Sequence, residues 1–194
     1  AQSLGVQVVV FPELCITAYT CGDLFFHDTL INAALEALKN ILDASQNVDC
    51  VIVLGVPLSF VEKLYNCAAV IFKGKILGLV PKKHLANFNE YYESRYFTSG
   101  DIDQKVNILG QEVYLSNCQI FVNDEMPEFK IGVEICEDLW VIKPPSIDYI
   151  KAGAFLIVNL SASNEVVSKP DYRRLLVASQ SARGVCGYVY CDAM

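Results

Sequence analysis

The chain has 194 residues, of which 53% are hydrophobic, and it carries a formal net charge of −7. This apolar content is enough to bury a core and argues against a disordered protein. Because no stripe rich in lysine and arginine occurs, we expect no nucleic-acid partner. No apolar run is long enough to span a bilayer, so we expect no membrane partner either.

The eight cysteines invite a disulfide framework, but a chain of this size and apolar content does not need one. There is no CxxC pair, and the only histidines are His27 and His84, so we expect no metal site. Reduced thiols in a cytoplasmic protein are the simpler interpretation.

The first elements have β-α-β order. Residues 6–12 and 50–56 have the pattern of buried strands. Residues 29–45 between them place apolar groups on one helical face, with Asp28 as the expected N-cap. This order implies parallel strands joined by a crossover helix.

A hairpin is predicted next, over residues 65–72 and 76–80, with Gly74 in its turn. Residues 82–104 are polar, aromatic and irregular, and a stretch of that length inside a compact domain is usually functional. Two short strands are expected near 105–115, followed by a strand over 129–135.

The last elements alternate again. They are a short helix over 146–152 with Ser146 as N-cap, a strand over 154–160, a helix over 170–182 and a strand over 187–191. Hairpin and parallel strands mixed with helices predict an α/β domain in which two sheets lie face to face with helices outside. We expect one domain over 1–194. Because the chain opens like the tail of a helix and stops just past a strand, we expect a piece of a longer polypeptide, with its fold incomplete at both ends.

Three predicted strands end at chemically useful side chains. Glu13 follows Pro12, Lys82 follows Pro81, and Cys136 closes the alternating run over 129–135. Taken singly, these are a loop acid, a surface lysine and a buried thiol. Together they place an acid, a base and a thiol at the ends of three strands, and a thiol presented in this way can act as a nucleophile.

A cysteine–histidine pair is an alternative. His84 lies two residues past Lys82, so in an extended stretch both side chains point the same way. The pair Cys136–His84 therefore stays open as a second catalytic arrangement.

Five segments of the chain resemble those of a known family. They are FPELCITAYTCGDLFF (11–26), VPKKHLANFNEYYESRYF (80–97), VEICEDLW (133–140), NLSAS (159–163) and RRLLVASQSARGVCGYVY (173–190). The chain resembles the nitrilase superfamily and, within it, the glutaminase domains of glutamine-dependent NAD synthetases. This resemblance implies a four-layer αββα sandwich and a Glu-Lys-Cys triad.

The resemblance implies a role for each reactive residue. Glu13 is the expected base, Cys136 the nucleophile, and Lys82 the cation beside the developing oxyanion. The backbone N–H of Glu137 is the expected second oxyanion donor. Glu93 matches a glutamate that positions the lysine, although a loop acid paired with its neighbour Arg95 is an equal alternative.

Three further residues match substrate-binding positions of the resembled domains, namely Phe88, Ser163 and Lys169. Trp140 is a fourth candidate, which either lines the pocket or belongs to the core. Phe88 stands where many members have tyrosine, and Lys169 where many have arginine. A lysine holds a carboxylate as a point charge, without the bidentate contact of arginine.

The expected reaction is hydrolysis of L-glutamine to glutamate and ammonia. The ammonia would pass to a synthetase domain or partner subunit. The hydrolysis step is expected to need no cofactor, and ATP and magnesium are expected only in the absent synthetase domain. A homo-oligomer is expected. A free-standing amidase or carbamoylase is the main alternative, and an inactive scaffold is another.

Overall fold

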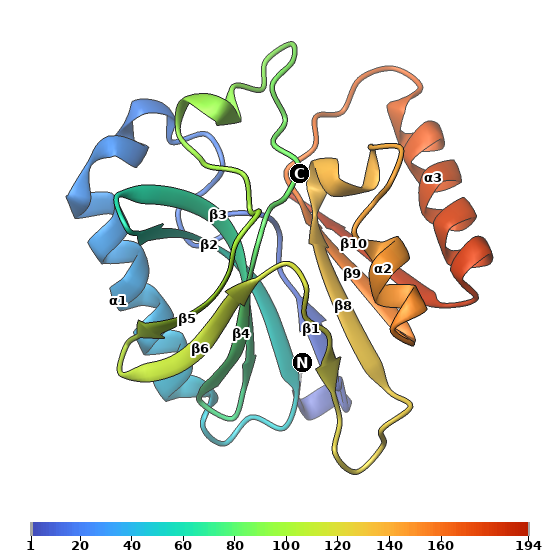
Figure 1. Ribbon diagram of the computed structural model, residues 1–194, viewed down its shortest axis with the longest axis horizontal. Coiled ribbons are helices and arrows are strands. Elements are labelled where there is room, and N and C mark those ends of the chain that lie inside the picture. Colours follow the sequence, from blue (N-terminus) through green and yellow to red (C-terminus); the bar gives the residue numbers. More distant parts are fainter. Residues whose placement is uncertain (1, 194) are drawn as a thin grey trace.

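The computed structural model describes residues 2–193, which form two mixed sheets and three α-helices (Figure 1). The six-stranded sheet contains, in spatial order, β1 (Val8–Val10), β2 (Val51–Phe60), β3 (Lys63–Phe72), β4 (Lys75–Pro81), β6 (Gln111–Ser116) and β5 (Asp103–Ile108). The four-stranded sheet contains β10 (Gly187–Asp192), β9 (Leu156–Ser161), β8 (Lys130–Ile135) and β7 (Phe121–Val122). The helices are α1 (Asp28–Ser45), α2 (Ser146–Lys151) and α3 (Lys169–Gly184).

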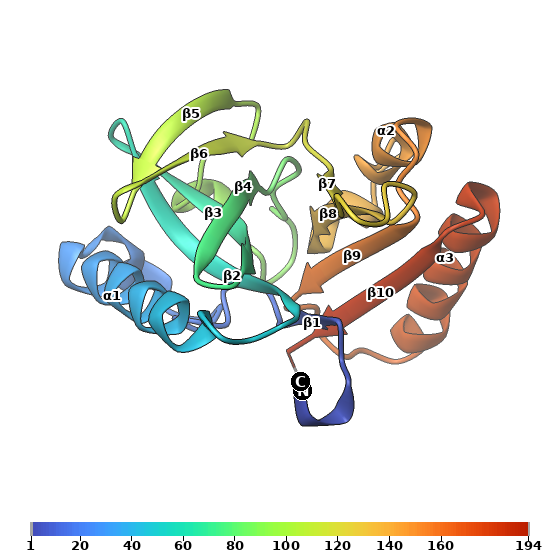
Figure 2. The same ribbon diagram turned by 90° about the horizontal axis from the view of Figure 1, so that it is seen from below.

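The two sheets pack face to face through an apolar layer. Val53 and Val70 of the larger sheet belong to the same buried cluster as Val133 and Val158 of the smaller one. Strands buried on both faces need nearly continuous apolar sequence, as β2, β3 and β9 have. Figure 2 shows the two sheets between α1 on one side and α2 and α3 on the other.

The helices cover the outer faces of the sheets. Leu38 and Leu42 of α1 pack into a cluster with Leu54 of β2. Across the molecule, Tyr149 of α2 packs with Ile157 of β9. No helix in residues 2–193 is long and apolar enough to cross a membrane.

Several sequence predictions are confirmed. β1 and β2 are parallel, with Val8 opposite Val51, and α1 is the crossover between them. β3 and β4 form the predicted hairpin around Gly74, whose φ of +76° suits glycine. The eight cysteines are all free. The expectations drawn from Ala1 and Met194 fall outside the described residues.

Both predicted N-caps are wrong. Asp28 is the first residue of α1 and His27 occupies the cap position without a side-chain hydrogen bond. Ser146 is likewise the first residue of α2, after Pro145. The hydroxyl of Ser146 accepts a hydrogen bond from Gln180 Nε2 at 2.9 Å, so a tertiary contact uses the group that was expected to cap the helix.

The predicted strand limits also need correction. β1 spans only Val8–Val10 of the expected 6–12, whereas β2 continues past residue 56 to Phe60 and forms a second hairpin with β3. Pro57 lies inside β2, opposite Asn66. The short strand β7 was not predicted.

Candidate active site

The segments that follow β1, β4, β8 and β9 lie at one end of the molecule, at the top of Figure 1. Parallel strands bring their carboxyl ends to the same edge, where α/β proteins place their ligand sites. The side chains predicted from the strand ends therefore meet here.

Lys82 lies at the centre of this region and is only 1% exposed. Its Nζ lies 2.7 Å from Glu13 Oε1 and 2.7 Å from Glu93 Oε1. Burial alone would lower the pKa of Lys82, but the two carboxylates and the neighbouring Cys136 raise it well above its ordinary value. The side chain is therefore a buried ammonium held between two acids.

Glu93 contacts Lys82, as the resemblance implies, and does not pair with Arg95. Besides Lys82, its carboxylate accepts hydrogen bonds from the Tyr19 hydroxyl at 2.8 Å and the Ala86 N–H at 2.7 Å. Arg95 pairs instead with Asp23, on the surface. The hydrogen bonds that Glu93 accepts therefore all hold its carboxylate beside Lys82.

Glu13 is fixed by donors from both sheets. Its Oε1 also accepts from Asn66 Nδ2 at 2.7 Å, and its Oε2 accepts from the Ala162 N–H at 3.0 Å. Burial raises the pKa of Glu13, while Lys82 and Asn66 oppose that rise. A carboxylate poised in this way can exchange a proton with a neighbouring group.

Cys136 begins a 3-10 helix, η4 (Cys136–Leu139), directly after β8. Its φ of +44° lies in the left-handed region, which is unusual for a residue with a side chain. Its N–H donates to Asn159 Oδ1 at 3.0 Å, and its Sγ accepts from the Ser161 hydroxyl at 3.2 Å. Strained backbone of this kind is characteristic of functional sites.

The thiol of Cys136 is protonated in this environment. Burial, and then the charge of Glu13, raise its pKa to about 12, while Lys82 and the Ser161 hydroxyl act in the opposite direction. A protonated thiol needs a base when it attacks, and Glu13 is the acid whose charge it feels most strongly.

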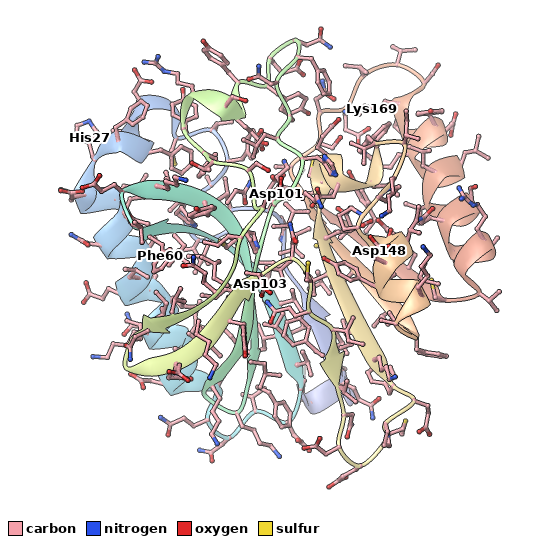
Figure 3. The ribbon with its side chains drawn as sticks, in the orientation of Figure 1. His27, Phe60, Asp101, Asp103, Asp148 and Lys169 are labelled. Carbon is pink, nitrogen blue, oxygen red and sulfur yellow. The ribbon has the colours of Figure 1, made fainter. Side chains whose placement is uncertain are left out.

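The cysteine–histidine alternative receives no support from the geometry. Among the described residues, no hydrogen bond joins His84 to Cys136. The sulfur of Cys136 accepts its hydrogen bond from the Ser161 hydroxyl instead. The other histidine, His27, lies at the start of α1, on the opposite side of the view from Lys169 (Figure 3).

The mouth residues are the four candidates for substrate binding, Phe88, Trp140, Ser163 and Lys169, and they are grouped around Lys169. Its Nζ donates to Asn164 Oδ1 and lies 5.4 Å from the centre of the Trp140 ring and 5.8 Å from that of Tyr91. Phe88, half exposed, packs edge-on against Tyr91 with 5.6 Å between ring centres. Lys169 begins α3, beside the loops that carry the site (Figure 3).

Glu137 connects the mouth to the buried cluster. Burial raises the pKa of this half-buried acid, and both Lys82 and Lys169 lower it, so its carboxylate senses both cations. Ser163 is buried, and its N–H donates to Asp192 Oδ1 at 2.7 Å. The structure thus brings all nine predicted site residues to one end of the fold.

Sequence reasoning missed several supporting groups. They are Asn66, Asp138, Asn159, Ser161 and Tyr190, whose hydroxyl lies 2.6 Å from Ser161 Oγ. Asn66 and Asn159 each interrupt a buried apolar strand. Because a buried amide needs hydrogen-bond partners, this interruption was a usable signal.

No group of three or more His, Cys, Asp or Glu side chains among residues 2–193 is arranged to hold a metal ion.

Comparison with known proteins places the chain in a family. The sequence pattern of carbon-nitrogen hydrolases matches residues 1–192. The glutamine-dependent NAD(+) synthetase of Mycobacterium tuberculosis is 38% identical over 190 residues, which are 97% of this chain and 28% of that protein. The chain therefore spans less than a third of the length of this relative.

Solved structures agree with the sequence comparison. A glutamine-dependent NAD(+) synthetase from Cytophaga hutchinsonii superposes with a TM-score of 0.86 at 30% identity, over 99% of this chain and 31% of that one. An amidase from Nesterenkonia sp. shares the fold, with a TM-score of 0.71 at 15% identity, over 99% of this chain and 65% of that one. With the match over residues 1–192, these findings show that the chain belongs to the carbon-nitrogen hydrolase family.

Proposed function

We propose that this chain hydrolyses the side-chain amide of glutamine, as the glutaminase part of a glutamine-dependent NAD synthetase. The observation that carries the proposal is the buried cluster in which Lys82 Nζ lies 2.7 Å from both Glu13 and Glu93, close enough to Cys136 to lower the pKa of its thiol. The 38% identity to a synthetase supports glutamine as the substrate. The proposal includes one domain over 1–194 with the four-layer αββα sandwich of its superfamily.

In the first half of the reaction, Cys136 Sγ attacks the amide carbon while Glu13 takes the thiol proton. The carbonyl oxygen becomes an oxyanion, and Lys82 Nζ and the N–H of Glu137 stabilise it. Glu13 then gives its proton to the amide nitrogen, ammonia leaves, and the acyl group remains on Cys136 as a thioester. The high pKa of the thiol explains why the base must act during the attack.

In the second half, Glu13 takes a proton from water, and the resulting hydroxide attacks the thioester carbon. The same two donors stabilise the second oxyanion. When this intermediate collapses, the thiolate leaves and takes the proton from Glu13, which releases glutamate and restores the site.

The mouth residues fit the amino-acid end of glutamine. Lys169 offers a positive charge for the α-carboxylate, and the rings of Trp140 and Tyr91 keep its ammonium in place. Phe88 supplies an apolar wall, and Ser163 a hydroxyl. Because Lys169 is a point charge, its hold on a carboxylate is less directional than that of an arginine.

The ammonia would be consumed by a synthetase part, carried on a longer polypeptide or on a partner subunit. That part would use ATP and magnesium, whereas hydrolysis requires only the side chains named above. The proposal places the protein in the cytoplasm as a homo-oligomer.

The test is labelling with a diazoketone analogue of glutamine, followed by peptide mass spectrometry. We expect modification of Cys136 alone among the eight cysteines, and protection of Cys136 by excess glutamine. Cys67, fully buried in the apolar core, and Cys118, exposed, are internal controls for access and for general reactivity.

Two outcomes would contradict the proposal. Label scattered over several thiols, unaffected by glutamine, would mean that no nucleophilic glutamine pocket exists. Protection by simple amides as effective as protection by glutamine would favour a free-standing amidase.

A further inference from the structure

Asp138 is a buried acid that takes no step in the proposed reaction. It lies in η4, two residues after Cys136, and is 2% exposed. One carboxylate oxygen, Oδ2, accepts a hydrogen bond from the Ile135 N–H at 3.0 Å. The other, Oδ1, accepts from the His84 N–H at 2.8 Å.

The two donors belong to the two catalytic segments. Ile135 is the last residue of β8 in the four-stranded sheet and directly precedes Cys136. His84 lies in the loop after β4 of the six-stranded sheet, two residues after Lys82. One carboxylate therefore joins the segment that carries the nucleophile to the segment that carries the cation.

The surroundings of Asp138 supply backbone donors and no cation in contact with its carboxylate. No salt bridge to Asp138 is found among residues 2–193, and burial and the nearby Glu134 raise its pKa to about 7. The charged and titratable groups around it are Glu134, Lys82 and Tyr149. An acid buried without a cation costs folding free energy, and the two backbone N–H groups are the hydrogen-bond donors that offset this cost.

We propose that Asp138 is a positioning residue whose carboxylate holds the Lys82 segment against the strained turn at Cys136. The assignment rests on the proposed function only for its consequence in turnover. Both of its partners are backbone N–H groups, which can only donate. Replacement by asparagine leaves one acceptor and turns an amide N–H₂ toward the second donor, so one of the two links breaks.

The reactivity of Cys136 gives a readout whose sign is diagnostic. The positive charge of Lys82 lowers the pKa of the Cys136 thiol. If Asp138→Asn lets the Lys82 segment move away, that pKa rises and alkylation at a fixed pH slows. Loss of a nearby negative charge, with the geometry unchanged, would instead lower the pKa and speed alkylation.

The experiment measures alkylation of Cys136 by iodoacetamide between pH 7 and 9 in the wild-type protein, in Asp138→Asn and in a control. Each unit by which the pKa rises lowers the thiolate fraction about tenfold at a given pH. Because the more basic thiolate is the better nucleophile, the alkylation rate falls about threefold per unit, and we expect slowing of at least this size in Asp138→Asn. The matched control is Gln180→Met, which also loses a buried hydrogen bond, the one to Ser146, without touching either catalytic segment. We expect its alkylation rate to match that of the wild type.

Alkylation that is unchanged or faster in Asp138→Asn would overturn the proposal. Iodoacetamide makes no use of glutamine, so a slowed reaction in a protein that hydrolyses no glutamine would keep this proposal and refute the proposed function. If Asp138→Asn does not fold, hydrogen exchange of the wild-type protein decides. Amides of His84 and Ile135 that exchange as fast as exposed loop amides would refute the bridge.

Discussion

The end of the fold that carries the candidate active site contains two pairs of buried carboxylates, and the two pairs are compensated in different ways. Glu13 and Glu93 share the ammonium of Lys82, at 2.7 Å from each. Glu134 and Asp138 have no salt bridge among the described residues. They accept hydrogen bonds from backbone N–H groups and, for Glu134, from the Tyr188 hydroxyl.

This difference separates a catalytic role from a positioning role. A cation shared by two acids provides a fixed positive charge beside a carboxylate that can exchange a proton, and amide hydrolysis uses both. Acids bound to backbone N–H groups fix the chain geometry and leave no charge free for a reaction. The first pair therefore fits chemistry, and the second pair fits positioning.

Removal of the shared cation is expected to have the largest effect. Lys82→Met leaves Glu13 and Glu93 buried side by side without compensation. Breaking a buried ion pair from one side costs about 3–5 kcal/mol, and losing an oxyanion donor slows turnover on the order of a hundred- to a thousand-fold. Urea unfolding and glutamine hydrolysis measure the two effects.

The adjacent lysine is the control for this prediction. Lys83 is partly exposed, and its Nζ lies 3.4 Å from Oδ1 of the exposed Asp101. Lys83→Met should therefore change the free energy of unfolding by less than about 1 kcal/mol. Equal destabilisation by the two variants would show that the buried cluster carries no special electrostatic weight.

Loss of the base alone is expected to have the next largest effect. Glu13→Gln should slow turnover on the order of a hundred- to ten-thousand-fold, because no group then takes the thiol proton. The same change should lower the pKa of Cys136, since the charge of Glu13 is one of the causes that raise it. Alkylation of Cys136 at pH 8 should then be faster, although catalysis is lost.

The opposite signs make this prediction informative. Glu112→Gln, at an exposed position of β6, is the control and should change neither quantity. If Glu13→Gln slows both turnover and alkylation, Glu13 holds the structure of the site and does not act as its base.

The sequence predicts the chemical residues better than the groups that support them. Glu13, Lys82 and Cys136 were predictable because each lies close after the end of a recognisable strand, and the ends of parallel strands meet. Asp138 was not, because its role depends on how η4 turns and on a loop from the other sheet. The wrong N-cap at Ser146 has a similar cause, since Glu134 and Gln180 use its N–H and hydroxyl.

The missed hairpin between β2 and β3 also has a physical reason. Its turn places Val61 and Glu62 at φ of +47° and +59°. Tight hairpin turns with positive φ at both central residues usually contain asparagine, aspartate or glycine. Val61 and Glu62 are none of these residue types, so the sequence does not indicate the turn. Pro57 also argues against a strand over the second half of β2.

The smallest predicted effect comes from the second pair. Glu134→Gln should leave turnover within about threefold of the wild type, because the new amide can accept from the Ser146 N–H and donate to the Tyr188 hydroxyl. A hydroxyl both donates and accepts, so Tyr188 can reverse its hydrogen bond. The two backbone donors on Asp138 cannot, so Asp138→Asn should be the more harmful change.

The pH dependence of stability checks this assignment. Burial raises the pKa of Glu134 above its ordinary value of 4.5. The folded state therefore holds this proton more tightly than the unfolded state, and the stability from this acid, complete below pH 4.5, is lost as the pH rises through the raised pKa. Glu134→Gln removes that contribution, so the free energy of unfolding should fall less steeply with rising pH. An unchanged slope in urea unfolding at a series of pH values would mean that Glu134 is ionised without cost, and the contrast between the two pairs would then fail at this residue.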